Sequence, residues 1–570
     1  MKTKFLYIIL ASLMIMSLAL VACQPKPAAT PEAAAEEPAA AEEAAEEPAA
    51  EMSAEEAELM VVTAPDCEYG GLIKEIAAVD ASTVQFTMCV PDPAFPSKAA
   101  FNVFGIQSSD WLASAIPSGE ILEMPIGTGA YYVDAWNRGD SLVFKKNENY
   151  WGTPAITDTL VFKWSAEAAS RLLELQAGTV DGIDNPSPDD FAVVEEDENL
   201  TLYEREALNI FYVAMTNTFE PFDNVLVRQA VAYALDRDRI VDTFYPVGST
   251  VASHFTPCAI PNGCVGDEWM AFDPDMAKAL LAEAGYADGF DTTIYYRDVV
   301  RSYLPEPGVV ATDLQAQLAQ VGINAEIEVM ESGAFIEESN AGRLDGIYLL
   351  GWGADYPHVT NFLDFHFSAT NPQFGDPIPE VYEPLAAAAQ IADPAEAEPL
   401  YIEANNALKE FVPMVPIAHG GSAAAYRAEV TGAHASPLGN EYFAVMDPGK
   451  DTFVWMQNAE PISLYCADET DGESLRACEQ VVEALLAYEI GGTDVLPGLA
   501  TACEPNDELT VWTCSLREGV TFSDGSALDA NDVVMSWSIA WDAANPLHVG
   551  NTGQFSYFSY LWGNLLNAAE

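Results

Sequence analysis

The sequence predicts an α/β protein with at least two lobes, and three observations support this prediction. At 570 residues, the chain is longer than one hydrophobic core usually supports. Half of its residues are hydrophobic, which is enough to fill sizeable cores. Beyond Cys67, strand-like and helix-like segments alternate along the chain, as is typical of α/β proteins. We therefore expect the folded body to begin near that residue.

The first residues have the pattern of an export signal. Two lysines precede an apolar run over residues 5–21, and small residues then lead to Cys23. A run of about 17 apolar residues is also near the lower limit for spanning a bilayer, so an uncleaved membrane anchor is the alternative. Residues 20–23 (LVAC) resemble the bacterial lipobox, in which cleavage leaves the cysteine as a lipid-bearing N-terminus. We expect residues 1–22 to be a lipoprotein signal peptide and Cys23 to be lipidated.

Residues 23–66 are expected to form an Ala/Glu/Pro-rich tether. The segment has almost no aromatic residue and cannot bury a core. Its glutamates repel one another and its prolines stiffen it, so it would hold the folded body away from the lipid surface. Pro31, Pro38 and Pro48 argue against the alternative of an amphipathic helix.

The charge balance excludes one class of partner. The chain has 23 basic and 88 acidic residues, a formal net charge of −65. Such a surface repels nucleic acid and anionic lipid headgroups. We expect no nucleic-acid partner.

Apart from Cys23, the chain has eight cysteines, an even number that suits disulfide pairing in an exported protein. By proximity in the sequence they form the candidate pairs Cys67/Cys89, Cys258/Cys264, Cys466/Cys478 and Cys503/Cys514. The last pair is the best supported, because residues 505–507 (PND) favour a turn that would bring its two cysteines together. The gaps are larger than in C-x2-C metal sites and none of the six histidines pairs suitably, so we expect no metal.

One stretch of the sequence has the pattern of a βαβ unit. Asp273 and Pro274 suit the start of a helix that ends at Gly285, and a short strand is expected over residues 292–296. A second helix with one apolar face follows up to Gly322, and residues 323–329 alternate as a strand. These elements predict parallel strands joined by a helix.

A candidate binding site follows the next apolar strand, expected over residues 346–350. The strand runs into Gly351–Pro357, where turn-forming and aromatic residues concentrate, and ligands gather at such strand ends in α/β sheets. Asp355 lies between Trp352 and Tyr356, which suits a cationic group shielded by aromatic rings. In the alternative, the rings are core residues and Asp355 caps the next helix.

A set of recognisable segments is spread over nearly all of the chain after Cys67. They are residues 125–131 (PIGTGAY), 149–152 (NYWG), 171–178 (RLLELQAG) with Asp181, 222–223, 227–230 with Tyr233, 282–286 and 351–356. Together they resemble family 5 solute-binding proteins, the dipeptide and oligopeptide binders of ABC importers. Their order departs from the family pattern. The segments that resemble the family's opening, 461–474, 516–525 (LREGVTFSDG) and 530–534, lie near the end of this chain, after a closing-like segment at 436–441. We therefore expect a circular permutation with its joint near residues 447–449.

The resemblance implies a type II, cluster C-like periplasmic-binding-protein fold, circularly permuted, with two α/β lobes that close around a ligand. We expect lobe 1 at residues 67–250 and 437–570 and lobe 2 at residues 251–436. By its position in the motif, Asp355 matches the aspartate that pairs with a peptide's α-amino group in this family, and Trp352 and Tyr356 would wall the site.

The implied role is peptide capture for an ABC importer with its permease and ATPase subunits, by a monomer without cofactors, lipid-anchored outside the cell membrane. Oligosaccharides are the alternative ligands, and a nickel complex is disfavoured because His358 and His366, eight residues apart, make no metal-ligand signature. We do not expect an enzyme, because the sequence has no G-x-S-x-G, no H-E-x-x-H and no phosphate loop. The remaining alternative is that the protein is a purely structural lipoprotein of the cell surface.

Overall fold

The structure, a computed structural model, describes residues 58–568. The predicted signal peptide, the predicted lipidation site Cys23 and most of the predicted tether lie outside the described residues. Between residues 58 and 568, no helix combines the length and apolar character that a membrane crossing requires.

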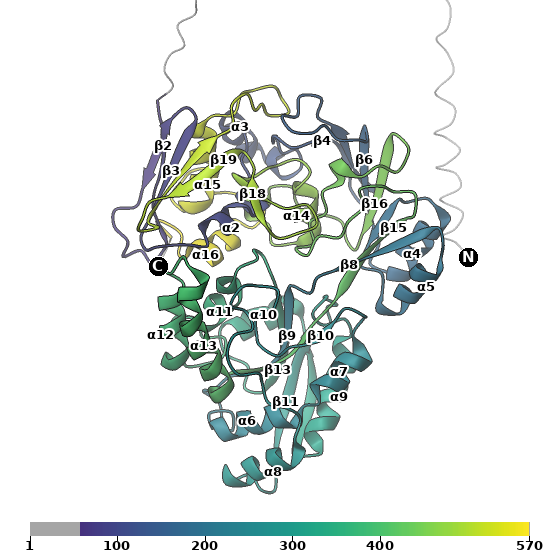
Figure 1. The fold of residues 1–570 in the computed structure, drawn as a ribbon, viewed down its shortest axis with the longest axis vertical. Coiled ribbons are helices and arrows are strands. Elements are labelled where there is room, and N and C mark those ends of the chain that lie inside the picture. Colours follow the sequence, from purple (N-terminus) through teal and green to yellow (C-terminus); the bar gives the residue numbers. More distant parts are fainter. Residues whose placement is uncertain (1–57, 569–570) are drawn as a thin grey trace, which may run out of the picture. The chain divides into compact units, whose positions relative to one another are not determined.

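Three larger sheets organise the described residues (Figure 1). We call the part built on the five-stranded and seven-stranded sheets lobe 1, and the part built on the six-stranded sheet lobe 2. A two-stranded sheet of β17 (Leu486–Tyr488) and β18 (Val495–Pro497) adds to lobe 1. The predicted α/β fold is confirmed.

The five-stranded sheet joins strands from both ends of the described chain. Its order is β1 (Val61–Thr63), β2 (Ile73–Asp80), β3 (Thr83–Met88), β20 (Val511–Leu516) and β19 (Ala500–Pro505). All of its neighbouring strands are antiparallel. Every second residue of β3 is buried, so this strand has one face on the core.

The seven-stranded sheet is mixed. Its order is β4 (Tyr131–Asn137), β5 (Ser141–Lys146), β6 (Thr159–Trp164), β16 (Thr452–Gln457), β7 (Gly182–Asp184), β15 (Ser422–Arg427) and β8 (Leu200–Arg205). Strand β16 runs parallel to both β6 and β7. Residues more than two hundred positions apart thus form one sheet of lobe 1.

The six-stranded sheet of lobe 2 contains the predicted βαβ unit. Its order is β10 (Thr250–Val251), β14 (Met414–His419), β9 (Asn209–Met215), β13 (Ile347–Gly353), β11 (Phe290–Arg297) and β12 (Ile323–Met330). Strand β11 is parallel to β12, with helix α9 (Pro307–Ala319) between them in the chain. The predicted helix before this unit is α8 (Pro274–Glu283), which the Asp273 side chain caps.

Helices pack around these sheets in both lobes. In lobe 1 they are α2 (Phe95–Ala99), α3 (Ser109–Ser118), α4 (Ala168–Ala177), α5 (Phe191–Glu196), α14 (Gly472–Cys478), α15 (Ala530–Trp541) and α16 (Ser556–Trp562). In lobe 2, besides α8 and α9, they are α6 (Val225–Ala234), α7 (Arg237–Phe244), α10 (Ser332–Asn340), α11 (Val359–Phe367), α12 (Pro379–Ala388) and α13 (Pro394–Phe411).

The chain crosses between the lobes at two neighbouring points, from β8 to β9 and from β14 to β15. Asn209 joins the two crossings, because its side-chain amide donates to the Gly420 carbonyl at 2.7 Å and accepts from the Gly420 N–H at 2.8 Å. Gly420 has no room for a side chain, since a Cβ would lie 2.0 Å from the Ser302 carbonyl oxygen. The lobe boundaries predicted at 250/251 and 436/437 stay predictions, and a division at these crossings is our proposal.

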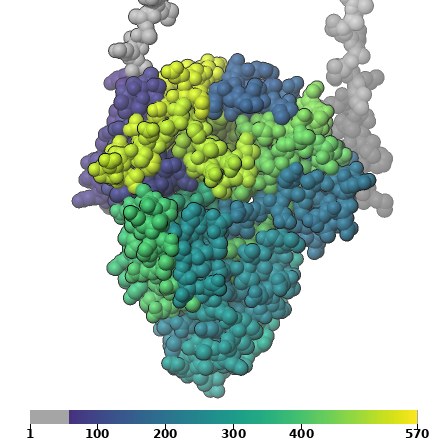
Figure 2. Space-filling model, in the orientation of Figure 1, coloured from purple at the N-terminus to yellow at the C-terminus, as the bar shows by residue number. Residues whose placement is uncertain are grey.

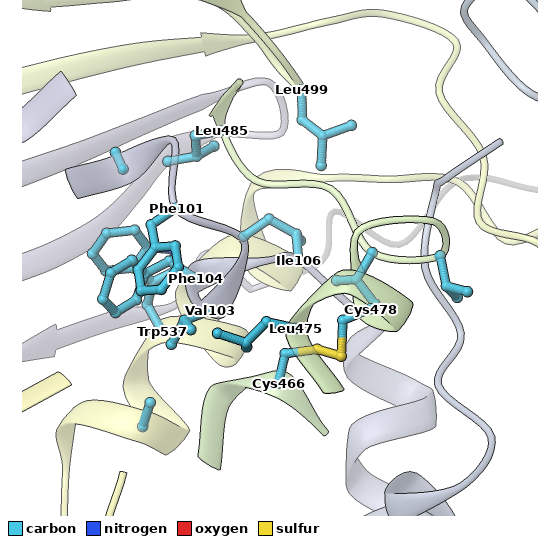
Figure 3. Close-up of a cluster of buried hydrophobic side chains, with 14 of the residues drawn as sticks. Phe101, Val103, Phe104, Ile106, Cys466, Leu475, Cys478, Leu485, Leu499 and Trp537 are labelled. Carbon is cyan, nitrogen blue, oxygen red and sulfur yellow. A yellow bond between two sulfur atoms is a disulfide. The ribbon is translucent and has the colours of Figure 1, made fainter. Parts of the chain in front are cut away.

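Each lobe has its own hydrophobic core. The core of lobe 2 draws on residues 208–418, and the main core of lobe 1 draws on residues 64–162 and 424–566 together with Tyr356. Figure 3 shows part of lobe 1, where Phe101, Phe104 and Trp537 cluster near the disulfide of Cys466 and Cys478.

The structure joins the same four cysteine pairs that the sequence suggested, Cys67–Cys89, Cys258–Cys264, Cys466–Cys478 and Cys503–Cys514. Cys503 and Cys514 are direct partners in the antiparallel pairing of β19 and β20. Leu509, with a φ of 57°, lies in the connection between these strands. The predicted turn therefore brings this pair together.

The last described helix lies against the first described strands. The Leu72 N–H donates to the Trp562 carbonyl at 2.7 Å, and Asn564 donates from its amide to the Tyr69 carbonyl at 3.1 Å. In Figure 2, atoms from the two ends of the described chain, coloured purple and yellow, cover neighbouring parts of lobe 1. Residues near 70 and 563 are thus spatial neighbours.

Candidate functional site

Asp355 is held in place by one amide side chain. It follows strand β13, and its carboxylate Oδ2 accepts from Asn361 Nδ2 at 3.0 Å. The Oδ1 atom of the same Asn361 accepts from the Asp355 backbone N–H at 3.0 Å and from Trp352 Nε1 at 3.2 Å. Because Asn361 is buried near the start of α11, it fixes both the loop and the carboxylate.

The Asp355 carboxylate is enclosed without a compensating cation. Desolvation raises its pKa to about 6, against the hydrogen bonds of Asn361 and Tyr557, which lower it. Among the described residues, no positive charge contributes to this balance. The side chain nevertheless keeps partial contact with solvent. An ammonium group arriving here would gain a charge-assisted hydrogen bond and would favour the ionised carboxylate.

Lobe 1 supplies the wall opposite Asp355. The Tyr557 hydroxyl hydrogen-bonds the Asp355 carboxylate, and burial together with the charge of Asp355 raises the pKa of this tyrosine. Burial raises the pKa of Tyr488, and the charge of Asp355 raises it further. The side chain of Tyr488 therefore also lies near the Asp355 carboxylate. Asp355 of lobe 2 is therefore close to two tyrosines of lobe 1.

Aromatic rings continue across the same boundary. The Trp352 ring stacks on Phe365 with centroids 4.4 Å apart and planes at 24°. Phe365 contacts Tyr560 of lobe 1 edge to face, with centroids 5.3 Å apart. Three aromatic side chains thus form a continuous row from β13 to α16.

The three residues singled out from the sequence have different surroundings. Trp352 and Asp355 are joined through Asn361, whereas Tyr356 is only 4% exposed and packs into the core of lobe 1. The Tyr356 hydroxyl shares a hydrogen bond with Thr360 at 3.0 Å. In the structure His358, not Asp355, is the N-cap residue of α11, because its Nδ1 accepts from the Thr360 N–H at 3.3 Å.

The two histidines near the site have little contact with solvent. His366 is buried and donates from Nδ1 to the Phe362 carbonyl at 2.7 Å. Desolvation lowers the pKa of His366 to about 3 and that of His358 to about 4. Within residues 58–568, no group of three or more His, Cys, Asp or Glu side chains is arranged to hold a metal ion.

Sequence reasoning missed the residues that complete the site. Asn361 lies six positions after Asp355 and was not distinguishable from any polar residue in a helix. Tyr488, Tyr557 and Tyr560 belong to distant segments. The only local signal was the aromatic run SYFSYLW over 556–562.

Two of the recognised sequence motifs meet at a partly buried carboxylate, that of Glu483. Glu483 accepts from Thr128 Oγ1 at 2.7 Å, from the Tyr150 hydroxyl at 2.8 Å and from Trp151 Nε1 at 2.7 Å. Thr128 belongs to PIGTGAY and the two aromatic residues to NYWG. These motifs hold lobe 1 together, since three donors satisfy one enclosed carboxylate.

A two-lobed α/β fold with an enclosed, uncompensated carboxylate between its lobes is the architecture of a protein that binds a small solute. Comparison with known proteins gives the family. The model for bacterial extracellular solute-binding proteins, family 5 (middle region), matches residues 36–374 and 494–556, and the chain belongs to this family. Its members are extracytoplasmic substrate-binding proteins of transport systems.

Individual relatives agree with this assignment. Di/tripeptide-binding protein 1 of Pseudomonas aeruginosa is 32% identical over 394 residues, which cover 67% of this chain and 73% of that protein. The structure of HbpA2 from Haemophilus parasuis is 31% identical, with a TM-score of 0.59, and the match covers 66% of this chain and 75% of that one. The dipeptide-binding protein of Pseudoalteromonas sp. SM9913, solved with Met-Leu, is 28% identical with a TM-score of 0.58 and the same coverage.

Proposed function

We propose that this chain captures di- or oligopeptides outside the cytoplasm and delivers them to an ABC importer. The observation that carries the proposal is the Asp355 carboxylate, enclosed between the lobes and lacking a cation. A peptide's α-amino group supplies the missing charge. The relatives named for di- and tripeptides, and the structural neighbour solved with Met-Leu, support this choice of ligand.

Closure of the lobes is the proposed signal to the importer. The two crossings joined by Asn209 form the hinge, and the ligand would contact Asp355 from lobe 2 and Tyr557 from lobe 1. A ligand shifts the open–closed equilibrium only by its differential affinity for the two states. A ligand that contacts both lobes would bind the closed state more tightly than the open state. In this proposal the chain is a monomer, catalyses no reaction and needs no cofactor.

The proposal includes export and anchoring. Residues 1–22 would direct secretion, and Cys23 would carry the lipid that holds the protein on the outer face of the cell membrane. Mass spectrometry of the protein from a bacterial membrane fraction tests this. A diacylglyceryl group on an N-terminal Cys23 is expected, and an intact Met1 would contradict it.

We also propose that the chain is a circular permutation of the family order. The contacts of Leu72 with Trp562 and of Tyr69 with Asn564 support this, because they bring the old neighbours together. A rearranged chain, with residues 450–568 placed before residues 58–449 through a flexible linker, keeps strand β1 and the Cys67–Cys89 disulfide, so it should fold and unfold at the same temperature. A rearranged chain that does not fold would refute the permutation.

The binding role is tested by thermal shift on the full chain with di- to octapeptides, N-acetylated peptides and oligosaccharides. A ligand at 100 times its Kd stabilises by about 2.7 kcal/mol. Peptides should stabilise the protein, and acetylation should abolish the effect. Asp355→Asn should weaken peptide binding about 10- to 100-fold, the value of a hydrogen bond to a charged group. The exposed Asp376→Asn is the matched control.

Stabilisation by oligosaccharides alone would leave a solute-binding role but reject peptides. If wild type and Asp355→Asn bound peptides equally well, the proposed contact between Asp355 and the peptide's α-amino group would be rejected.

A further inference from the structure

One loop of lobe 1 is wrapped around a buried carboxylate. Asp468 is only 3% exposed, and its carboxylate accepts five hydrogen bonds between 2.6 and 3.2 Å. The donors are the backbone N–H groups of Thr552, Gly553, Gln554 and Phe555 and the Thr552 hydroxyl. Successive backbone N–H groups form a concave anion site, and here a side chain of the protein itself occupies that site.

The loop is shaped around this carboxylate. Gly550 has no room for a side chain, because a Cβ would lie 2.4 Å from Asp468 Oδ2 and 2.7 Å from Asp468 Cβ. Phe555 has a φ of 46°, in the left-handed region that residues other than glycine rarely adopt. Such a conformation persists only where the surroundings impose it, and the Phe555 N–H donates to Asp468 at 2.8 Å. The course of residues 550–555 therefore depends on Asp468.

Asp468 is itself held in place. It ends a short helix, Cys466–Asp468, and its N–H donates to the Tyr465 carbonyl at 3.1 Å. The first residue of this helix is joined to Cys478, at the end of α14, by a disulfide. The carboxylate is thus a fixed point to which the loop is attached.

The loop leads directly into helix α16, which contacts lobe 2. Tyr560 of this helix meets Phe365 of lobe 2 edge to face, with centroids 5.3 Å apart. Phe365 stacks on Trp352 at 4.4 Å, and Trp352 Nε1 donates to Asn361, the residue that holds Asp355. Direct contacts therefore connect α16 to the proposed amine-binding carboxylate.

Helix α16 depends on this support for its position. It spans seven residues, and helices of this length are unstable in isolation. Its N-cap residue is Phe555, whose side chain has no hydrogen-bonding group. Phe558, Leu561 and Trp562 pack into the core of lobe 1, whereas Tyr560 is 45% exposed. Because Asp468 fixes where the helix begins, it also fixes where the Tyr560 ring lies.

We propose that Asp468 is a positioning residue for ligand binding, because it holds the loop that places Tyr560 against Phe365. This rests on the proposed function. Asp468 lies beneath the loop and acts through it. With the loop fixed in advance, closure of the lobes does not carry the entropy cost of ordering this wall, and the closed state is favoured.

Calorimetry on the full chain tests the inference with Met-Leu, or with the tightest binder among the di- to octapeptides. Asp468→Asn should weaken binding about 3- to 10-fold, the fold-change that one aromatic pair contributes. Gly550→Ala should do the same, because its Cβ pushes the loop away from an unchanged Asp468. Tyr560→Ala should also weaken binding about 3- to 10-fold. The double variant Asp468→Asn/Tyr560→Ala should show about the larger of the two factors and not their product, since both act on one contact.

Asp532→Asn is the matched control. Asp532 is a lobe 1 carboxylate, 5% exposed, that accepts from the Ser109 and Asp529 N–H groups at 2.8 and 2.9 Å. Its replacement should lower the unfolding temperature and leave the Kd unchanged. A change in Kd equal to that of Asp468→Asn would show that any loosening of lobe 1 weakens binding, and would overturn the inference.

The remaining outcomes separate this inference from peptide capture. If wild type binds a peptide and Asp468→Asn and Gly550→Ala bind it equally well, the inference is overturned and peptide capture stands. If the effects of Asp468→Asn and Tyr560→Ala multiply, Asp468 does not act through this ring and the inference is again overturned. If wild type binds no peptide of the set, peptide capture fails and the inference fails with it.

Discussion

Replacing Glu441 by glutamine should destabilise lobe 1 by about 3 kcal/mol at neutral pH. Glu441 is fully buried and accepts from Arg205 Nη2 at 2.6 Å and from Arg476 Nε at 2.7 Å. Asp184 pairs with the same two arginines at 2.7 and 3.1 Å. Glutamine would leave two buried arginines with one carboxylate, and breaking a buried pair from one side typically costs about 3–5 kcal/mol.

The pKa of Glu441 gives the same magnitude and a pH dependence. Desolvation alone would raise this pKa, but the charges of Arg205 and Arg476 outweigh it and lower the pKa from 4.5 to about 2. A shift of that size corresponds to roughly 3 kcal/mol. Because the folded-state pKa is depressed, the contribution is complete above pH 4.5 and is lost as the pH falls toward 2.

The assay is urea unfolding followed by tryptophan fluorescence, since Trp455 lies beside Arg476 with the guanidinium 5.7 Å from its ring centroid. The control is Glu429→Gln, because Glu429 is exposed and its ion pair with Arg427 should contribute at most about 1 kcal/mol. A Glu441→Gln protein as stable as wild type at pH 7, or one whose deficit is unchanged at pH 3, would refute the reasoning.

Two further predictions concern carboxylates with raised pKa values. Desolvation, with the charges of Asp468 and Asp471, raises the pKa of Glu469 from 4.5 to about 7, so its contribution to stability is present below pH 4.5 and lost as the pH rises through 7. Glu469→Gln should therefore raise the unfolding temperature at pH 8 but not at pH 4, and equal effects at both pH values would contradict this. Asn361→Ala should weaken peptide binding about 10-fold and, because the Asn361 hydrogen bond lowers the pKa of Asp355, move the pH midpoint of binding above 6. An unmoved midpoint would show that Asn361 does not position the carboxylate.

Local patterns predicted the elements that are local in the structure. The helix after Asp273 and the paired strands β11 and β12 follow from caps and apolar periodicity within a few turns of chain. The pairing of Cys503 with Cys514 follows from a turn between adjacent strands. In these cases each interaction lies within the segment that encodes it.

Only half of the site could be predicted, because its other residues come from distant segments of the chain. Asp355 and Trp352 stand at a strand end, which the sequence marks. Tyr557 and Tyr488 come close to Asp355 only through the packing of lobe 1, and no spacing within the chain predicts that proximity. Whether Tyr356 lines the space or packs in a core depends on its rotamer, since the ring is equally suited to either.

Under the proposed hinge motion, the position of Tyr356 would affect how fast a bound solute leaves. This residue follows a strand of lobe 2, but its ring packs into the core of lobe 1. Under the proposed hinge motion, separating the lobes would draw the ring into water, at a cost of about 1.5–3 kcal/mol for a large apolar side chain. This cost is the same for every ligand, because it arises from separating the lobes. It would slow spontaneous release by roughly 10- to 100-fold. A transporter that pulls the lobes apart would supply this work, so unloading would be fast at the membrane and slow elsewhere.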